Sequence, residues 1–432
     1  MERTYDLAEA GLATLGAGRR IVESAGPGGV DGRGRYVILA HRDPVEFLAG
    51  FFSALSEGLD IWLASPSWSA ERMEKVAAIA ERVRRGNRES RPDGEKSFIF
   101  IPTGGTTGRL KFAAHTEETL AASARGFLEF FGCEQGHLTL CVLPPYHVSG
   151  LMQAVRAAIS GGRIYFGDPG DPLSTRNLPD DFNPKGCFIS LVPTQLRRLI
   201  DGGGSEWLAR FGTVIVGGAA LDERLASLAS EKRIPLSPSY GMTETAALVC
   251  ALRPDEFLAG ETGSGRPLPH AEIAIEPAEN SEPRRGIIVI RATSAGVGYA
   301  DENGYAPRDG PIRTQDFGAI DERGILHVEG RADRTIICGG EKIDASEIEE
   351  VLIGSGMVAD AVVIGLPDPE WGSVAAAFYV PCEKFSGDEM LAKAIEEKLS
   401  RMHVPKIWKK LDIIPRTDAG KPDISILRTN IR

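Results

Sequence analysis

The chain has 432 residues, so two or three domains are expected rather than one. Its 42% hydrophobic and 25% charged residues are typical of a soluble globular protein, and its net charge of −11 argues against a nucleic-acid-binding protein. No apolar run is long enough to span a bilayer, and the first residues lack the apolar core of a signal peptide, so a cytoplasmic location is expected.

The six cysteines are scattered along the chain and form no C-x-x-C pair. This spacing argues against a zinc site and against a disulfide framework. Most of them lie in apolar runs, which favours buried free thiols in a reducing compartment.

Strands and helices alternate in the first third of the chain. Asp43, Pro44 and Glu46 form a capping pattern at the start of the first predicted helix. The predicted elements are a strand at 36–40, a helix from 43 to 58, a strand at 60–64, a helix at 69–85 and a strand at 97–101. This alternation predicts an α/β fold with a mainly parallel sheet.

A glycine- and threonine-rich stretch follows the strand at 97–101. It contains Thr103, Gly104, Gly105, Thr106, Thr107, Gly108 and Lys111. Glycines let the backbone approach a ligand closely, and inward N–H groups with hydroxyls and an ammonium favour an anion. The spacing fits neither G-x-x-x-x-G-K-[ST] nor G-x-G-x-x-G. By itself the stretch is therefore either a phosphate-binding loop or a simple turn.

The alternation resumes after this loop and later gives way to short β segments. Helices are predicted at 116–130, 151–159, 194–200 and 221–230, and strands at 138–143, 163–166, 187–192 and 213–216. The β segments at 271–275, 286–290 and 324–328 predict a small β-rich subdomain. An α+β pattern follows, with strands at 335–338, 359–364 and 373–380 and helices at 345–353 and 386–400. We therefore expect an N-terminal domain, 1–332, and a smaller α+β C-terminal domain, 333–432.

Four further stretches carry residues suited to nucleotide chemistry, although each has a plainer alternative. The first stretch consists of Ser239, Tyr240, Gly241, Met242, Thr243 and Glu244. It offers a turn, a flat ring for a base and oxygens for a hard cation. The alternative is the capped start of a helix. Asp316 presents two acceptors to a vicinal diol, or simply occupies a turn. Arg331 and Asp333 form a hinge or a charged linker, with Gly339 and Gly340 in a turn just beyond them. Lys421 lies on a Pro/Gly-bounded loop near the C-terminus, where a lysine is most often a solvated charge.

Taken in order, the five stretches resemble the adenylate-forming superfamily of acyl- and aryl-CoA synthetases, peptide-synthetase adenylation domains and firefly-type luciferases, over roughly residues 97–423. The resemblance implies that Thr103 to Gly108 and Lys111 hold the ATP phosphates. It implies an adenine site lined by Gly217, Gly218, Ala219, Ala220, Ser239, Tyr240 and Gly241, with Met242 as a further cofactor-binding residue. Asp316 would bind the ribose, and Arg331 the nucleotide. Thr243 and Glu244 would order Mg²⁺.

The same resemblance implies a mobile C-terminal domain. Asp333 would be its hinge, and Lys421 would be the catalytic lysine of adenylation. After rotation about Asp333, Gly339 and Gly340 would lie along the channel for the pantetheine arm of CoA.

A narrower resemblance is carried by residues 101–108, 143–152 and 191–196. It is to the o-succinylbenzoate–CoA ligase family of menaquinone and phylloquinone synthesis. It places His147, Ser149 and Gly241 at the acyl substrate, and Arg198 or Arg197 at the succinyl carboxylate. The alternatives are a buried histidine at a helix start and a solvated helix arginine. The loop departs from the family in two places, since Gly104 replaces the usual serine and Leu110 the usual proline before Lys111.

The resemblance implies an ATP-dependent carboxylate–CoA ligase that acts through an acyl-adenylate, most specifically on o-succinylbenzoate. Lys421, Glu244, Lys111 and His147 are its expected catalytic residues. ATP, Mg²⁺, CoA and a small carboxylic acid are its expected cofactors and partners, with no nucleic acid or membrane, and a homo-oligomer is left open. The alternatives are another aryl- or acyl-CoA synthetase, a free-standing adenylation enzyme that loads a carrier protein, and a non-catalytic nucleotide-binding relic. The presence of Glu244 and Lys421 argues against the relic.

Overall fold

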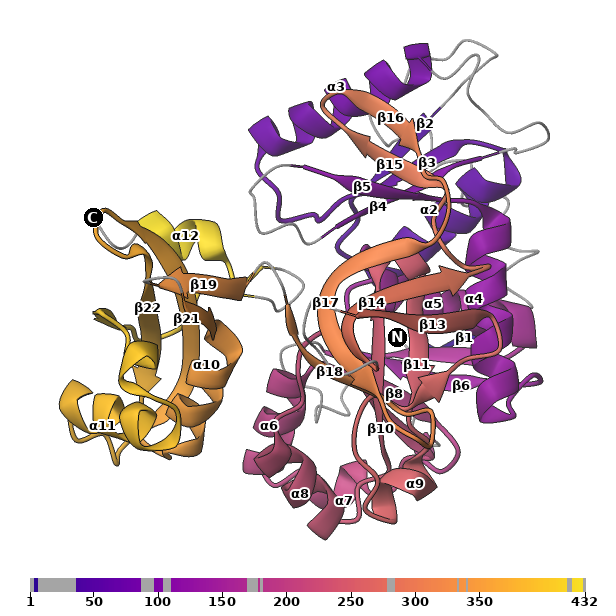
Figure 1. The fold of residues 1–432 in the computed structure, drawn as a ribbon. Helices are drawn as coiled ribbons and strands as arrows, with labels where there is room; N and C mark the ends of the chain where they lie inside the picture. The colour runs from indigo at the N-terminus through magenta and orange to yellow at the C-terminus, as the bar shows by residue number, and fades with distance from the viewer. Residues whose placement is uncertain are drawn as a thin grey trace.

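The computed structural model describes residues 4–6, 36–86, 97–103, 110–168, 178, 182–277, 284–331, 334–338, 341–417 and 422–429. They form two lobes, a large one from residues up to 331 and a small one from residues 334 onward (Figure 1). None of the described helices is both long and apolar enough to cross a membrane. All six cysteines are free thiols, and four of them are buried.

An eight-stranded sheet forms the centre of the large lobe, in the order β1-β7-β6-β8-β9-β10-β11-β12. Its strands are β1 (Thr4–Asp6), β6 (Leu138–Cys141), β7 (Arg163–Phe166), β8 (Phe188–Leu191), β9 (Thr213–Val216), β10 (Leu236–Met242), β11 (Ala247–Ala251) and β12 (Arg266–Pro267). The strands from β7 to β10 pair in parallel, whereas β1, β11 and β12 add antiparallel edges. Strands β8 and β9 are buried along their whole length, as expected when helices cover both faces of a parallel sheet.

Helices cover both faces of this sheet. One face carries α6 (Pro193–Asp201), α7 (Ser205–Leu208), α8 (Glu223–Glu231) and α9 (Pro254–Leu258), whose apolar residues share a core cluster with β6, β8 and β9. On the other face lie α2 (Pro44–Ser56), α4 (Glu117–Phe131) and α5 (Val148–Ser160). In that layer Met152 of α5 shares one core cluster with Phe166 of the central sheet and Ile61 of a second sheet. These helices therefore fill the space between two sheets.

The second sheet has six strands in the order β16-β15-β5-β4-β3-β2. They are β2 (Tyr36–Leu39), β3 (Asp60–Leu63), β4 (Ile99–Pro102), β5 (Phe112–His115), β15 (Gly298–Asp301) and β16 (Gly304–Pro307), and α3 (Ala70–Gly86) packs on the sheet. Strands β2, β3 and β4 are parallel, which confirms the predicted β-α-β alternation. Strand β5 was not predicted from the sequence, and it pairs antiparallel with β4. The glycine-rich stretch thus joins the two strands of a hairpin.

A third sheet of four antiparallel strands, β13-β14-β17-β18, forms the predicted β-rich subdomain. Its strands are β13 (Ala271–Pro277), β14 (Arg285–Ala292), β17 (Ile312–Ile320) and β18 (Leu326–Arg331). The longest strand, β17, was not predicted as a strand, and it contains Asp316. The plainer alternative, in which Asp316 simply occupies a turn, is therefore wrong.

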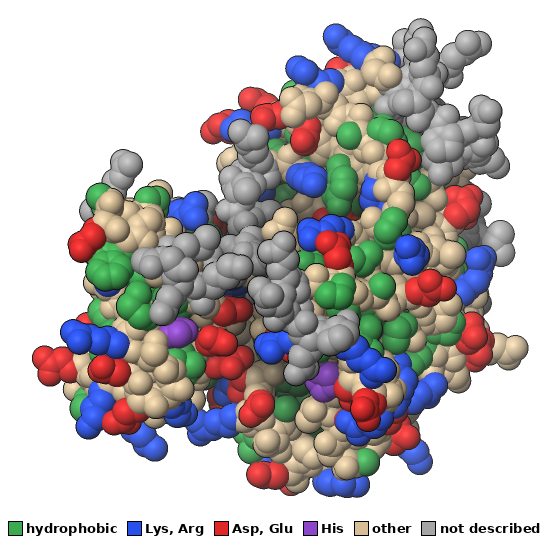
Figure 2. Space-filling view, viewed as in Figure 1, with side chains coloured by type: hydrophobic (Ala, Val, Ile, Leu, Met, Phe, Trp, Pro, Cys, Tyr) green, Lys and Arg blue, Asp and Glu red, His purple; other side chains and the backbone are tan. Residues whose placement is uncertain are grey.

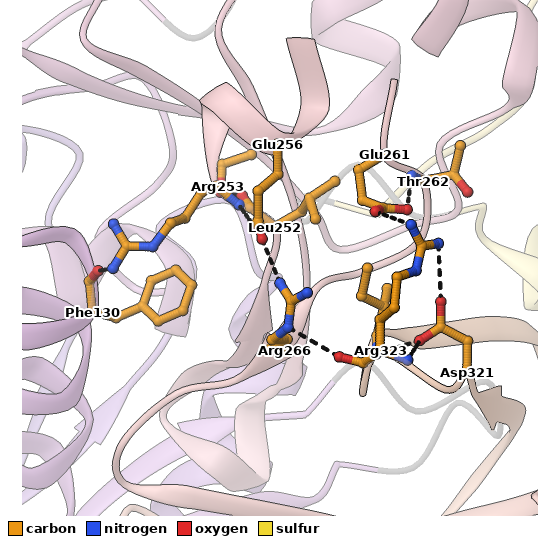
Figure 3. A network of polar contacts seen from close by, with 11 residues as sticks. Phe130, Leu252, Arg253, Glu256, Glu261, Thr262, Arg266, Asp321 and Arg323 are labelled. Carbon is orange, nitrogen blue, oxygen red and sulfur yellow. Dashed lines mark hydrogen bonds and ion pairs between the residues drawn. The ribbon is translucent and has the colours of Figure 1, made fainter. Parts of the chain in front are cut away.

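An ion-pair network fastens the β17–β18 turn to the central sheet (Figure 3). Arg266 of β12 pairs with Glu256 of α9, and its Nε donates to the carbonyl of Arg323 at 3.1 Å. Arg323 pairs with Glu261 at 2.5 Å and with Asp321 at 3.2 Å. Single exposed pairs contribute little to stability, but this series of pairs links the third sheet to the edge of the first.

The small lobe has its own sheet and core. Its strands are β19 (Thr335–Cys338), β20 (Glu341–Asp344), β21 (Val358–Asp368), β22 (Gly372–Pro381) and β23 (Ile407–Lys410), and its helices are α10 (Ala345–Gly354), α11 (Asp388–Lys398) and α12 (Ile424–Thr429). The sheet order is β20-β19-β22-β21, with β23 paired to β22. Apolar residues of α10, α11 and the sheet form one cluster that includes Ile348, Leu391 and Tyr379. In Figure 1, α10 lies on the side that faces the large lobe.

Candidate active site

Three strands of two sheets bring Tyr240, Asp316 and Arg331 together. Tyr240 lies on β10, and its hydroxyl donates to Asp316 Oδ2 at 2.5 Å. Arg331 lies directly opposite Asp316 in the β17–β18 pairing, and its Nη1 donates to Asp316 Oδ1 at 3.2 Å. The Asp316 carboxylate is thus buried between a phenol and a guanidinium. Burial, followed by the negative charge of Asp316, raises the pKa of Tyr240, so the phenol is neutral at pH 7.

Thr314 fixes the backbone of Asp316. Its buried hydroxyl donates to the carbonyl of Ile288 at 2.8 Å and accepts from the backbone N–H of Asp316 at 3.0 Å. Thr314 therefore links β17 to β14 two residues before Asp316. Each carboxylate oxygen carries two lone pairs, so Asp316 can still accept hydrogen bonds from a vicinal diol.

The end of β9 and the middle of β10 approach each other closely. The Ser239 hydroxyl donates to the carbonyl of Val216 at 3.1 Å, and a Cβ added to Gly217 would lie 2.7 Å from that hydroxyl oxygen. Gly218 has a φ of +81°, a conformation that favours glycine. Ala219 and Ala220 follow as exposed residues. The adenine residues implied by the resemblance therefore lie on β10 and in the segment directly after β9, beside the Asp316 cluster.

Strand β10 continues through the motif that was expected to be a turn or a helix start. Gly241 and Met242 belong to β10, and only Thr243–Thr245 form a short 3₁₀ turn. Gly241 lies at a bulge in the β10–β11 pairing, where a Cβ would meet the carbonyl oxygen of Ala247 at 2.0 Å. Gly241 is thus required for a close approach of two strands, and the expectation of a tight turn at Gly241 is wrong.

The turn after Glu244 contains two alanines in a strained conformation. Ala246 and Ala247 have φ of 50° and 80°, in the left-handed region that residues with a Cβ rarely adopt. Two serine side chains hold this turn. Ser123 of α4 donates to the carbonyl of Ala246 at 2.5 Å, and Ser294 donates to that of Thr245 at 2.9 Å. This turn determines where the side chains of Thr243 and Glu244 point.

His115 connects β5 to the same turn. Its Nε2 lies 2.8 Å from the carbonyl of Thr243, which can only accept, so Nε2 carries the proton. Burial lowers the pKa of His115 to about 4, and the ring is therefore neutral at pH 7. The backbone N–H of Gly296 donates to the carbonyl of Glu244 at 2.8 Å. His115 thereby joins the glycine-rich hairpin to the Thr243–Glu244 turn by a direct hydrogen bond, and Gly296 joins the same turn to the segment before β15.

The oxygens of Thr243 and Glu244 suit a hard cation. Both side chains are half-buried, and within the described part of the chain Glu244 forms no ion pair. The described residues hold no group of three or more His, Cys, Asp or Glu side chains that could bind a metal ion by themselves. The site therefore fits a divalent cation whose other ligands come from a bound phosphate and water.

Thr103, Leu110 and Lys111 at the base of the glycine-rich hairpin are described. Thr103 donates from its backbone N–H to the carbonyl of Lys111 at 2.9 Å, and its hydroxyl lies 3.2 Å from the same oxygen. Leu110 packs with the apolar cluster of the second sheet, whereas Lys111 points to the opposite side, where its ammonium lies 3.5 Å from the ring centroid of Tyr299. Tyr299 comes from β15 and was not predicted as a site residue.

The residues expected at the acyl substrate lie on α5 and α6. His147 is the N-cap residue of α5, with its ring 4.7 Å from that of Tyr146, and Ser149 is exposed in the first turn. Helix α5 therefore begins three residues before its predicted start at 151. On α6, Arg197 pairs with Asp222 at 2.6 Å, whereas Arg198 is exposed. The described contacts leave the roles of these four residues as predictions.

Several expected site residues lie outside the described residues: Gly104, Gly105, Thr106, Thr107, Gly108, Asp333, Gly339, Gly340 and Lys421. Their roles stay predictions. The structure adds three residues that the sequence did not single out, namely His115, Thr314 and Tyr299. Only Thr314 had a local signal, because it stands two residues before Asp316.

Two family comparisons cover most of the chain. Residues 61–300 match the AMP-binding enzyme family, and residues 347–421 match the AMP-binding enzyme C-terminal domain. The 2-succinylbenzoate–CoA ligase of Bacillus cereus is 33% identical over 350 residues, which are 78% of this chain and 70% of that protein.

Solved structures of the o-succinylbenzoate CoA synthetase of Bacillus subtilis share the fold at 24% identity. The complex with an acyl-adenylate intermediate has a TM-score of 0.78 and covers 96% of this chain and 92% of that one. The complex with ATP and magnesium ion has a TM-score of 0.76 and covers 96% and 94%.

Proposed function

The chain belongs to the AMP-binding enzyme family, and from this premise we propose that it joins o-succinylbenzoate to coenzyme A, consuming ATP and releasing AMP and pyrophosphate. The coarser assignment, an adenylate-forming acyl-CoA ligase, follows from the family. The choice of acid is supported by 33% identity to a 2-succinylbenzoate–CoA ligase over 70% of that enzyme's length.

One structural observation carries the nucleotide part of this proposal. The buried carboxylate of Asp316 is oriented by Tyr240 and Arg331 beside the Ser239–Gly217 contact. A ribose diol on Asp316 would place its base against β9 and β10. The Thr243–Glu244 turn continues from β10, so it would lie toward the phosphates.

The reaction has two steps. A carboxylate oxygen of the acid attacks the α-phosphorus of ATP, a P–O bond forms, and pyrophosphate leaves with the electron pair of the broken bond. The thiolate of CoA then attacks the acyl carbon of the adenylate, a thioester forms, and AMP leaves with the electron pair of the C–O bond. A thiol with a pKa near 8.5 is partly ionised at neutral pH, so no strong protein base is required.

The protein's contribution is to position the substrates and to stabilise charge on phosphate oxygens. Lys111 and the backbone of residues 104–108 would bind the phosphates, with Lys421 added by the small lobe. A magnesium ion held by Glu244 and Thr243 would supply further positive charge there. We propose that the division into domains 1–332 and 333–432 serves this arrangement, with Asp333 as the hinge.

The test is AMP release with and without CoA, across o-succinylbenzoate, benzoate and fatty acids. We expect o-succinylbenzoate to yield AMP and thioester only when CoA is present in an amount stoichiometric with the acid. Activity on fatty acids without activity on o-succinylbenzoate would overturn the choice of acid and leave the ligase assignment intact. AMP release with no thioester would favour an adenylation enzyme that loads a carrier protein.

The two arginines of α6 provide a matched pair of variants. Arg198→Met should raise KM for o-succinylbenzoate about tenfold or more, because it removes a charge-assisted hydrogen bond, while KM for ATP stays unchanged. Arg197→Met breaks the pair with Asp222 and should leave the KM for the acid unchanged. The reverse pattern would assign the succinyl carboxylate to Arg197.

Lys421→Ala tests the division of labour between the two half-reactions. It should lower acid-dependent pyrophosphate exchange by about 10² to 10³, the usual cost of one lost transition-state charge contact. Thioester formation from preformed adenylate should remain near the wild-type rate. Equal losses in both reactions would contradict a role restricted to adenylation.

A further inference from the structure

Tyr299 lies where two chain segments far apart in sequence pair as strands. Strands β15 and β5 are antiparallel, and Tyr299 stands opposite Ala113. Lys111 is two residues before Ala113 and is therefore a diagonal neighbour of Tyr299 on the same face of the sheet. At this spacing, about 7–8 Å between strand positions, a long side chain can reach an aromatic ring.

The Lys111 ammonium lies over the ring of Tyr299. Its Nζ lies 3.5 Å from the centroid of the Tyr299 ring, within the range of a cation–π contact. The phenol is neutral at pH 7, because burial and then the charge of Glu244 raise the pKa of Tyr299 to about 12. The ring therefore attracts the ammonium through its π face and leaves its positive charge uncompensated.

Glu244 is the nearby carboxylate whose charge acts on the same phenol. The backbone of Glu244 is bound to Gly296, three residues before Tyr299. Across the described ranges neither Lys111 nor Glu244 belongs to an ion pair. The remaining cation, Arg308, is held by backbone, since its Nε donates to the carbonyl of Gly296 at 2.8 Å and its Nη1 to that of Gly310. Of the charged groups around Tyr299, Arg308 is thus bound to backbone carbonyls, whereas Lys111 and Glu244 do not neutralise each other.

We propose that Tyr299 is a positioning residue that holds Lys111 on its ring and keeps it from pairing with Glu244. The inference rests on the proposed nucleotide-binding function. A Lys111–Glu244 ion pair would occupy the carboxylate oxygens needed by a divalent cation and would compensate the charge needed by the phosphates. The aromatic ring avoids both losses, and it also restricts the flexible lysine before the nucleotide binds, which reduces the entropy lost on binding.

The experiment compares Tyr299→Leu with Tyr299→Phe by calorimetric titration of MgATP in the absence of acid. Tyr299→Leu removes the ring and should weaken MgATP binding about three- to tenfold, with a matching rise in the Mg²⁺ concentration needed for half-maximal binding. Tyr299→Phe keeps the ring face and should restore binding to within about twofold of wild type. Equal affinities for the wild type and Tyr299→Leu would overturn the proposal.

Two controls separate positioning from a general loss of structure. Tyr305→Phe on β16 removes a hydroxyl that donates to the carbonyl of Val297 at 3.1 Å, and it should leave MgATP affinity unchanged. In a Lys111→Met background, Tyr299→Leu should have little further effect, because the two residues act as one unit. Additive losses in the double variant would contradict a role through Lys111. If Tyr299→Leu melts early, Tyr299→Thr, which suits a strand, takes its place in the same cycle.

The Tyr299 experiment and the test of the proposed function can fail independently of each other. Wild-type protein that binds MgATP but releases no AMP with any acid would overturn the ligase assignment and still allow the Tyr299 comparison. Wild-type activity together with unchanged MgATP binding by Tyr299→Leu would overturn only the positioning role.

Discussion

Asp316 has protein donors on both carboxylate oxygens, the Tyr240 hydroxyl at 2.5 Å and Arg331 Nη1 at 3.2 Å. Together with the Thr314 hydrogen bond to its backbone, these contacts fix one orientation of the carboxylate. A group oriented before a ligand arrives loses less entropy when the ligand binds. If Asp316 binds the ribose diol as proposed, its protein contacts prepare the carboxylate for it.

Tyr240→Phe removes one of these donors. We expect the free energy of unfolding to fall by about 1.5 kcal/mol, the typical contribution of a hydrogen bond to a charged group, and ATP affinity to fall about fivefold. Urea unfolding and ATP titration measure the two effects. An unchanged ATP affinity with reduced stability would limit Tyr240 to a structural role.

The left-handed pair Ala246–Ala247 gives a second prediction for single residues. Ala247→Gly should stay within about 1 kcal/mol of wild type, because relief of the strained φ offsets the lost methyl and the greater backbone entropy. Ala247→Val should cost about 3 kcal/mol, because a branched Cβ is poorly accommodated at φ of 80°.

Ala154→Gly is the matched control, since Ala154 is a buried alanine in the regular helix α5. It should cost about 2 kcal/mol through helix propensity and lost burial. Thermal and urea unfolding give the order of the three variants. A larger loss for Ala247→Gly than for Ala154→Gly would show that the turn is not strained.

At the scale of elements, two arginines anchor the segment between the lobes. Arg331 at the end of β18 is bound to Asp316 in the large lobe. Arg334 is bound to Glu349 of α10 in the small lobe, where Glu349 also accepts from the backbone N–H of Val363 at 2.6 Å. Between these anchors lies Asp333, the proposed hinge. Rotation about Asp333 would therefore leave both arginine anchors intact.

Arg334→Met tests the anchor in the small lobe. Burial already raises the pKa of Glu349, and loss of its cation would leave a buried carboxylate unpaired. We expect the small lobe to lose about 2 kcal/mol at pH 7, seen as an earlier transition in scanning calorimetry. The loss should shrink as the pH falls, because protonation of Glu349 removes the uncompensated charge.

Two further variants complete this test. Adding Glu349→Leu to Arg334→Met should recover most of the stability, because no buried charge remains. Arg313→Met, which breaks the exposed pair with Glu276, should change the calorimetric trace little. A similar effect for Arg313→Met and Arg334→Met would contradict the anchoring role.

At the scale of the whole molecule, acidic side chains gather where the two lobes face each other (Figure 2). Burial, followed by the charges of Glu223, Asp344, Glu347 and Asp222, raises the pKa of Glu350. Two of these residues lie at the start of α8 in the large lobe, whereas the others belong to the small lobe. Repulsion across this boundary favours weak docking of the lobes, which suits the proposed movement of the small lobe.

The raised pKa of Glu350 sets the pH dependence of this docking. When the pKa of a carboxyl group is raised in the docked state, docking weakens as the pH rises past the ordinary pKa of that group, because the carboxyl loses its proton. Docking becomes stronger again as the pH falls. We expect the radius of gyration, measured by small-angle scattering, to decrease between pH 7 and pH 5. Glu350→Gln should be more compact at pH 7 and less dependent on pH.

Glu396→Gln is the control for the net charge, because Glu396 is exposed on α11. It should keep the wild-type pH profile. An identical profile for Glu350→Gln and the wild type would show that the repulsion at Glu350 does not influence the arrangement of the lobes.

The sequence by itself determined the elements whose signals are local. Asp43 caps its helix as predicted, Thr116 caps α4 at the predicted helix start, and Gly161 ends α5 in a left-handed conformation. These features depend on side-chain hydrogen bonds and backbone preferences within a few residues, so they can be read from short patterns. The ordered motifs likewise identified the family without any distance between them.

Only the tertiary structure decided how those motifs meet. Asp316 lies within β17, Gly241 within a bulged strand, and Lys111 above the ring of Tyr299. Each of these contacts depends on which strands pair and in which register, and a shift of one residue would turn each side chain to the opposite face. Strand pairing joins residues far apart in the chain, so no local pattern specifies it. The sequence therefore supplied the chemical groups of the candidate site, and the pairing of β5 with β15 and of β10 with β11 determined which of them became neighbours.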